Sequence, residues 1–400
     1  MAPAEGGPPR VVAGLLVAQR AMGIDAQVLC GDSDLPAHLA HWRAHTPGFP
    51  AGAVHAVAGA SLLSRRAALQ SWLRTHLHGF DVLHVHQIWR LVPTLATNIS
   101  RHMGKPYLIA PHTSMSPWAL SQKRLKKSLA RRLIWNRILH GAAGLHALND
   151  LEAAEIRCCF GANAPPIFVV PNGVSLSEFP ARSTLAVPDR LAGFLSAPTG
   201  AAPFVLFLAR LHTMKGPDLL LDAFAAVAGR YPLLQLVFAG PDFGMLAQLR
   251  KRVSAHGLAG RVHFLGLVSG AERHWLLYNA LCVCQPSREE AFSLSILEAL
   301  ACARPVVISD RCKFPQVATA GAGVVVPLAT TPLSAALETY VSDPVRRARD
   351  GEHARALIEE SYNLETIARL TEEMYGKAIA ARAQPGNSGS SGTLTSPAQF

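Results

Sequence analysis

Two glutamates in the last third of the sequence have the type and the spacing of ligand-binding carboxylates. Glu290 and Glu298 stand eight positions apart, where a polar loop leads into a helix that we expect to begin near Ser293 or Leu294. Free backbone amides in a first helical turn suit a phosphate, and the flanking carboxylates suit hydroxyl groups on both sides of it. Taken alone, two such glutamates are more often a loop residue near a cap and an ordinary helix residue.

Two cations follow a strand in the same half of the chain. Arg210 and Lys215 come after the apolar run 204–209 and before a helix that we expect to begin near Pro217. Arginine offers a planar fork of donors and lysine a point charge, and both suit a diphosphate. Two solvated loop cations are the alternative for this segment by itself.

These side chains need a scaffold in which the carboxyl ends of several strands meet. Short β-branched or apolar runs alternate with helix-length segments, which is typical of parallel α/β layers. We predict strands at 26–30, 82–86, 107–110, 144–147 and 167–170, and then at 204–209, 234–239, 262–265, 280–285, 305–308 and 323–326. The predicted fold is α/β, with two doubly wound, Rossmann-like lobes facing a central cleft, because such sheets bind ligands at the carboxyl ends of their strands.

The predicted domain boundaries follow from composition. Residues 1–178 form the first lobe, and residues 179–375 form the second, which begins with a connector rich in Pro, Ala and Gly. The last helix is open to two placements, within the second lobe or returned to the first. The tail 384–400 has almost no large apolar residues, and we expect it to be disordered.

The amino terminus departs from this pattern. Gly6-Gly7-Pro8-Pro9 precedes a helical stretch over 11–22 and looks like the loop of a βα unit, but the five residues before it are not strand-like. The first lobe is therefore expected to lack its opening strand. Two interpretations stay open: a mis-assigned start codon, or a weakened lobe.

The composition excludes several classes of protein. Half of the 400 residues are apolar and the mean hydropathy is +0.20, yet no run reaches the ~18 apolar residues that span a bilayer, and we identify no export signal. The seven cysteines show no C-x-x-C pair and no zinc spacing, which favours reduced thiols in a cytoplasmic protein. Asp32-Ser33-Asp34 spells D-x-D, a metal-binding motif elsewhere, but we interpret it as a loop.

Positive charge is concentrated in one segment. The net charge is +11, and between Asp81 and Asp150 no acidic residue occurs while ten basic ones do. Within 121–137 apolar residues recur at helical spacing beside the cations, which favours docking to an anionic membrane surface, with Trp118 and Trp135 in support. A solvated helix face is the alternative. No helix-turn-helix, finger or RNA-binding pattern points to nucleic acid.

Together these motifs resemble the retaining glycosyltransferase family 4, which has the GT-B fold. The resemblance rests on Glu-x7-Glu set in Phe-Ser-Leu-Ser-Ile-Leu-Glu-Ala-Leu-Ala, on Arg-Leu-x-x-x-Lys-Gly about 75 residues upstream, on Pro171-Asn172-Gly173-Val174 and on Tyr362-Asn363-Leu364. It extends over nearly the whole chain, from Gly6-Gly7-Pro8 onward. Departures from the family pattern leave the identity of the donor sugar open; they are at Ser175, Ala209, Ala291 and Ser293.

The resemblance implies a role for each residue of the site. Arg210 and Lys215 would bind the donor diphosphate and neutralise the leaving group, without a metal or a further cofactor. Glu290 would contact the donor sugar and Glu298 the ribose. The phosphates would meet the amides around Ser293 and Leu294. His112 would lie beside the donor sugar as a further catalytic residue, and the donor site would also include Gly6, Gly7 and Asn172.

The implied function is transfer of a hexose, with retention, from a nucleotide diphosphate sugar to a glycan or lipid-linked acceptor. The resemblance places this reaction in surface polysaccharide synthesis, in the cytoplasm at the inner face of the cell membrane. A sugar-nucleotide epimerase of the same fold is the nearest alternative. An inactive sugar-nucleotide-binding protein is the alternative outside enzymes, and the missing opening strand favours it.

Overall fold

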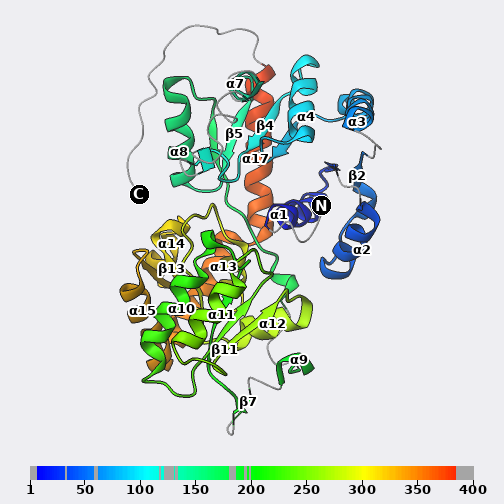
Figure 1. Cartoon of the computed structure of the whole chain (residues 1–400). Helices are drawn as coiled ribbons and strands as arrows, with labels where there is room; N and C mark the ends of the chain where they lie inside the picture. The colour runs from blue at the N-terminus through cyan, green and yellow to red at the C-terminus, as the bar shows by residue number, and fades with distance from the viewer. Residues whose placement is uncertain are drawn as a thin grey trace.

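The computed structural model describes residues 7–31, 34–57, 62–116, 119–120, 130, 134–179, 186–192, 196–197 and 200–383 of the chain. These residues form two lobes, each built on parallel strands, which lie one above the other in Figure 1. Gly6, Trp118, most of the basic segment 121–137 and the tail 384–400 were the subject of predictions, but they lie outside the described residues.

Among the described residues, the main sheet of the second lobe has six parallel strands in the order β11-β10-β9-β12-β13-β14, and β7 (Ser196–Ala197) and β8 (Gly200–Ala201) form a short antiparallel pair before it. This is a doubly wound order, in which the chain reverses direction across the sheet between β9 and β12. Every strand predicted for this half is confirmed, with no end more than two residues from its predicted place. The strands are β9 (Phe204–Leu208), β10 (Gln235–Ala239), β11 (Val262–Gly266), β12 (Cys282–Gln285), β13 (Val306–Ser309) and β14 (Gly323–Val326).

Helices cover both faces of this sheet. Val205 and Phe207 of β9 belong to one buried apolar cluster, and Leu206 and Leu208 belong to another, because successive side chains of a strand point to opposite faces. The covering helices are α10 (Pro217–Ala228), α11 (Leu246–Ala255), α12 (Gly270–Asn279), α13 (Leu294–Ala301), α14 (Gln316–Thr319), α15 (Thr330–Ser342) and α16 (Pro344–Leu357).

The first lobe contains two separate parallel sheets. One has the order β3-β4-β5-β6, from β3 (Leu83–His86), β4 (Tyr107–Ala110), β5 (Gly144–Ala147) and β6 (Ile167–Val169). The other pairs β1 (Val28–Cys30) with β2 (Val54–Ala56), a three-residue strand that the sequence analysis missed. The described helices of the first lobe are α1 (Gly7–Ala21), α2 (Leu35–His45), α3 (Leu62–His76), α4 (Leu91–His102), α7 (Asn136–His140) and α8 (Asp150–Phe160).

The beginning of the described chain differs from the expectation. Gly7, Pro8 and Pro9 do not form a loop but the first turn of α1, where proline is tolerated because its missing N–H would have no helical partner. Residues 1–6, which precede α1, lie outside the described residues, so the expectation of a missing opening strand stays a prediction. The two sheets of this lobe are joined through side chains, since Leu29 of β1 and Leu83 of β3 pack against one apolar cluster of α3 and α4.

The chain passes between the lobes twice, and the two passages are hydrogen-bonded to each other. The Val174 N–H donates to the Tyr362 carbonyl over 3.0 Å, and the Leu364 N–H donates to the Val174 carbonyl over 3.0 Å. The last helix, α17 (Leu364–Ala383), then lies against α1 and β4 of the first lobe (Figure 1). Gly173 is closely surrounded there, because a Cβ on it would lie 3.1 Å from the Tyr362 carbonyl oxygen.

Trp135 and Asp34 were also given expected roles from the sequence. Trp135 is 3% exposed and contacts Trp89 with a ring-centroid distance of 5.6 Å, so it belongs to the core of the first lobe and offers no surface to lipid. Asp34 precedes α2, and its side chain makes no capping hydrogen bond; Asp32 and Ser33 are outside the described residues. No described helix has the length and apolar character needed to cross a membrane.

Candidate functional site

Lys215 and Glu290, which stand 75 positions apart in the sequence, form an ion pair in the structure. Lys215 ends a 3-10 turn (Thr213–Lys215) after β9, and Glu290 lies in the loop after β12. The two strands are neighbours at the switch point of the sheet, and therefore their carboxyl ends bring the two side chains together. The Gln285 Nε2 also donates to Glu290 Oε2 over 2.9 Å.

A second set of contacts fixes these two loops on each other. The Arg288 guanidinium donates to both carboxylate oxygens of Asp218 over 2.9 and 2.7 Å, and the Arg288 N–H donates to the Met214 carbonyl over 2.7 Å. Gly216, with φ +69°, turns the chain beside Pro286, and a Cβ there would lie 2.0 Å from the Pro286 carbonyl oxygen. The loop that carries Glu290 is therefore built against the loop that carries Lys215.

Arg210 lies on the same side of the second lobe and has a different environment. Its guanidinium lies over the ring of Phe243, 5.0 Å from the centroid. No acid of the described residues lies within ion-pair distance of it. Arg210 thus retains a charge that an anionic ligand could neutralise, while Lys215 would have to exchange its carboxylate partner for one.

The first turn of α13 follows Ser293, as predicted. The Ser293 hydroxyl donates to Gln285 Oε1 over 3.0 Å and does not cap the helix. Ser295 donates to the same oxygen over 2.9 Å. The Gln285 amide therefore contacts the start of α13 through its oxygen and the Glu290 carboxylate through its nitrogen. Leu294 is the first residue of the helix.

Glu298 is placed with charges that the sequence analysis did not anticipate. Its side chain is 1% exposed and contacts Arg273 Nη2 over 3.2 Å and a guanidinium nitrogen of Arg10. Arg10 comes from α1 of the other lobe, and its Nη2 also lies 3.9 Å from Glu178 Oε2. The carboxylate predicted to bind ribose therefore joins the two lobes in this structure.

His112 lies at the end of β4 and belongs to a cluster of imidazoles. Its Nε2 is 2.9 Å from His86 Nδ1, and the two rings stack. On the same sheet His84 Nε2 is 3.1 Å from His146 Nδ1, and His146 Nε2 is 2.6 Å from the Val170 carbonyl. The last contact requires a proton on His146 Nε2, and in the neutral ring this leaves Nδ1 to accept from His84.

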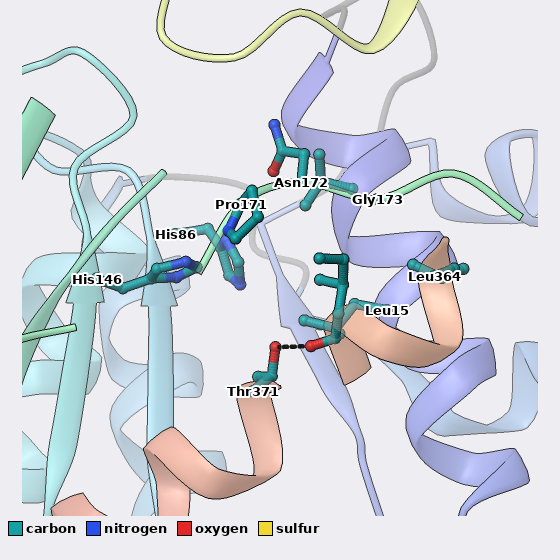
Figure 2. Close-up of a pocket in the computed structure, with 10 residues that line it drawn as sticks. Leu15, His86, His146, Pro171, Asn172, Gly173, Leu364 and Thr371 are labelled. Atoms are coloured by element: carbon teal, nitrogen blue, oxygen red, sulfur yellow. Dashed lines mark hydrogen bonds between the residues drawn. The ribbon is translucent and has the colours of Figure 1, made fainter. Parts of the chain in front are cut away.

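The predicted donor-site residue Asn172 is buried at the boundary between the lobes. Its Nδ2 donates to the Phe292 carbonyl over 3.0 Å, two residues beyond Glu290. Beside it, a cavity of about 20 Å³ lies between α1, α17 and the sheet, and Figure 2 shows His86 and His146 directed toward Pro171 on one wall. This volume holds about one water molecule. Gly7 begins α1, and Gly6 is outside the described residues.

Burial keeps the histidine cluster neutral. Burial and, secondarily, the neighbouring imidazoles lower the pKa of His84 and His86 well below 6.5. The same causes lower the pKa of His112 to about 3, and burial lowers that of His146 to about 4. Burial also lowers the pKa of three further histidines, which are His212, His263 and His274.

These shifts predict that the protein loses stability as the pH falls from 7 to 5.5. The unfolded chain takes up protons on the four cluster histidines below pH 6.5, whereas the folded chain does not, so acid favours unfolding by up to about 1.4 kcal/mol per pH unit for each of these four. Burial raises the pKa of Glu152 and Glu178, which titrate in the opposite sense but are outnumbered. Urea titrations at several pH values measure the slope. A stability that is flat over this range would contradict the prediction.

Arg10, Arg273 and a second inter-lobe ion pair were not predicted from the sequence. Lys313 contacts Glu155 of α8 over 2.7 Å and Glu289 over 2.9 Å. No local pattern marks these residues, because their partners are far apart in the sequence. Asn149 and Glu152 were also missed, although Asn-x-x-Glu before an apolar helix is a recognisable capping signature.

Two facing lobes on parallel sheets, with cations and carboxylates at the strand ends between them, define the class of GT-B glycosyltransferases. A solved structure of Anabaena Alr3699/HepE in complex with UDP and glucose has this fold, with a TM-score of 0.72 over 93% of this chain and 97% of that one, at 21% identity. Residues 6–173 match the glycosyl transferase 4-like domain, and residues 196–363 match glycosyl transferases group 1. The chain belongs to the retaining glycosyltransferase family 4.

Curated relatives agree with this assignment. The chain is 30% identical to the D-inositol 3-phosphate glycosyltransferase of Arthrobacter sp. (strain FB24), over 76% of this chain and 72% of that protein. It is 33% identical to the enzyme of the same name from Jonesia denitrificans, over 45% of this chain and 44% of that protein. The Jonesia alignment thus spans less than half of that relative.

Proposed function

We propose that this chain transfers a hexose, with retention of configuration, from a nucleotide diphosphate sugar to a glycan or lipid-linked acceptor in surface polysaccharide synthesis. The observation that carries the proposal is the Lys215–Glu290 pair at the switch point of the second sheet, with Arg210 on the same loop as Lys215. Cations at this point suit a diphosphate, and a carboxylate beside them suits the hydroxyl groups of the attached sugar.

In the proposed reaction, positive charge meets the diphosphate as it leaves the sugar. Lys215 transfers its contact from Glu290 to a phosphate oxygen, and Arg210 supplies the second cation. Glu290, released from the ion pair but still held by Gln285, accepts hydrogen bonds from the sugar. Stabilising charge that develops in the transition state is commonly worth 10²- to 10³-fold in rate for one donor group.

Further residues are assigned to the same proposed site. His112 lies beside the donor sugar, and its neutral imidazole can accept or donate one hydrogen bond. The amides at Ser293 and Leu294 receive the phosphates, and Glu298 binds the ribose once Arg10 moves away from it. Gly6, Gly7 and Asn172 complete the donor site from the first lobe.

The acceptor side is proposed from charge. Ten basic residues and no acidic residue lie between Asp81 and Asp150. This positive charge favours approach of the first lobe to an anionic membrane surface, where a lipid-linked acceptor would lie. Among its described members, Arg101 and Lys105 lie at the carboxyl end of α4 and just after it.

A donor screen tests the proposed function. We expect the purified protein to release nucleoside diphosphate from at least one of UDP-glucose, UDP-galactose, UDP-N-acetylglucosamine and GDP-mannose, and to do so faster when a lipid-linked acceptor fraction is added. Chromatography of the sugar product separates transfer from epimerisation, since an epimerase yields a changed sugar nucleotide without an acceptor. No release from any donor, with or without acceptor, would count against catalysis.

A further inference from the structure

The first turn of α8 contacts the loop that carries Glu290. Asn149 caps this helix, and its Oδ1 accepts the Glu152 N–H over 2.8 Å. Its Nδ2 donates to the Ala291 carbonyl over 2.7 Å, across the boundary between the lobes. Since Ala291 directly follows Glu290, the cap of a first-lobe helix holds a second-lobe loop.

The same turn also contacts the loop that carries His112. The Glu152 carboxylate is 3% exposed, and it accepts the Thr113 N–H on Oε1 and the Leu148 N–H on Oε2, each over 2.8 Å. His112 and Thr113 have φ values of 49° and 62°. This left-handed backbone costs roughly 1–2 kcal/mol per residue for a side chain other than glycine. A buried acceptor for the Thr113 amide helps to hold the loop in this conformation.

One turn further along, Glu155 extends the contact. Its carboxylate pairs with Lys313, and Lys313 pairs with Glu289, the residue before Glu290. Lys313 is 8% exposed, so this pair is largely shielded from solvent. Asn149, Glu152 and Glu155 are spaced by three, which places them along one side of the helix start.

We propose that Asn149 and Glu152 are positioning residues of this enzyme: they fix the His112 loop of one lobe and the Glu290 loop of the other on a single helical turn. The helix thereby sets where the two loops lie relative to each other across the cleft. The proposal rests on the proposed function for the roles of His112 and Glu290. The contacts themselves are independent of it.

The first arm of the test measures the two loops directly, by hydrogen–deuterium exchange of the full-length protein. Asn149→Asp keeps the helix cap but replaces the donor to Ala291 with a carboxylate oxygen, so amides of 288–294 should exchange at least ~10-fold faster. Glu152→Ala should do the same for amides of 110–116, and Glu152→Gln, which keeps one acceptor, should have a smaller effect. These factors correspond to the loss of one hydrogen bond to a buried or charged group.

A matched control uses an asparagine at the opposite edge of the sheet. Asn279 ends α12 and precedes β12, whereas Glu290 follows β12, and the Asn279 Nδ2 donates to the Trp275 carbonyl over 2.8 Å. Asn279→Asp therefore removes the same kind of amide donor away from the two loops. We expect it to leave exchange in 110–116 and 288–294 unchanged.

The second arm measures turnover with UDP-glucose and GDP-mannose as probes. We expect kcat to fall about 10- to 100-fold in Asn149→Asp and Glu152→Ala, as small displacements of reacting groups commonly cause. In the Glu152 variants, KM for the donor should stay within about threefold, because Arg210 and Lys215 are untouched. Asn279→Asp should retain kcat.

The two arms separate the possible failures. Unchanged exchange in both loops overturns the proposal, as does a kcat within twofold of the wild type when wild-type turnover is measurable. A loss of kcat that only parallels a loss of folded protein by circular dichroism also overturns it, and Glu152→Gln guards against a variant that does not fold. If the wild type turns over neither probe, the proposed function fails on these donors, while the exchange arm still decides whether α8 holds the two loops.

Discussion

Replacement of Lys215 with alanine is expected to reduce turnover of the donor by about 10²- to 10³-fold, with the fold intact. The ammonium group is one of two cations proposed to neutralise the leaving diphosphate, and removal of a single group of this kind commonly costs that factor. The variant also leaves Glu290 without its ion-pair partner at a largely shielded position, although Gln285 still donates to it. Release of nucleoside diphosphate from the donor found in the screen is the measurement.

The control for this prediction is another lysine of the same lobe. Lys251 lies on α11 and is exposed, so Lys251→Ala removes the same charge from the protein without touching the loops after β9 and β12. Its turnover should equal that of the wild type. Full activity of Lys215→Ala, with an unchanged dependence on donor concentration, would show that this cation does not meet the diphosphate.

Gly216→Ala is expected to lower the free energy of unfolding by about 2–5 kcal/mol. The left-handed φ of +69° costs roughly 1–2 kcal/mol with a side chain, and a Cβ 2.0 Å from the Pro286 carbonyl oxygen forces a backbone shift of roughly 1–3 kcal/mol. Because Pro286 begins the loop that carries Glu290, donor turnover should fall as well. Urea titration gives the stability, and the donor assay gives the activity.

A second glycine distinguishes the cost of the left-handed backbone from the cost of the steric clash with Pro286. Gly257 has nearly the same φ, +65°, but a Cβ there would have no atom within 4 Å. Gly257→Ala should therefore cost only the roughly 1–2 kcal/mol of the backbone conformation and leave turnover unchanged. Equal stability losses in the two variants would contradict the close approach of Gly216 to Pro286.

Local patterns were sufficient to predict most of the fold. Most buried strands of the second lobe are nearly continuous apolar runs, because both faces of a parallel sheet are covered, and such runs are visible in a sequence. β2 was missed because it has only three residues, Val54–Ala56, which are too few for a clear run. The first turn of α1 was predicted as a loop because glycine and proline occur most often in turns and loops.

The candidate site divides in the same way. Lys215 and Glu290 could be brought together in advance, since a doubly wound sheet joins the ends of the strands that precede them. The partners of Glu298 and Asn149 could not. Arg10 and Ala291 lie in the opposite lobe, 288 and 142 positions away, and only the packing of the two lobes places them in contact. A resemblance to a family suggests the role of a residue, but it does not predict which residues of this chain contact it.

The paired passages at Val174 and Tyr362–Leu364 constrain how the cleft can widen. Since each passage is hydrogen-bonded to the other, they act as one two-stranded pivot, and the lobes cannot slide past each other without breaking it. A rotation of the lobes about these passages would have to break the Arg10–Glu298 pair, the Asn149–Ala291 hydrogen bond and the Lys313–Glu155 pair. Opening of the cleft is therefore opposed by contacts on several elements, which a bound ligand or a rearranged loop would have to replace.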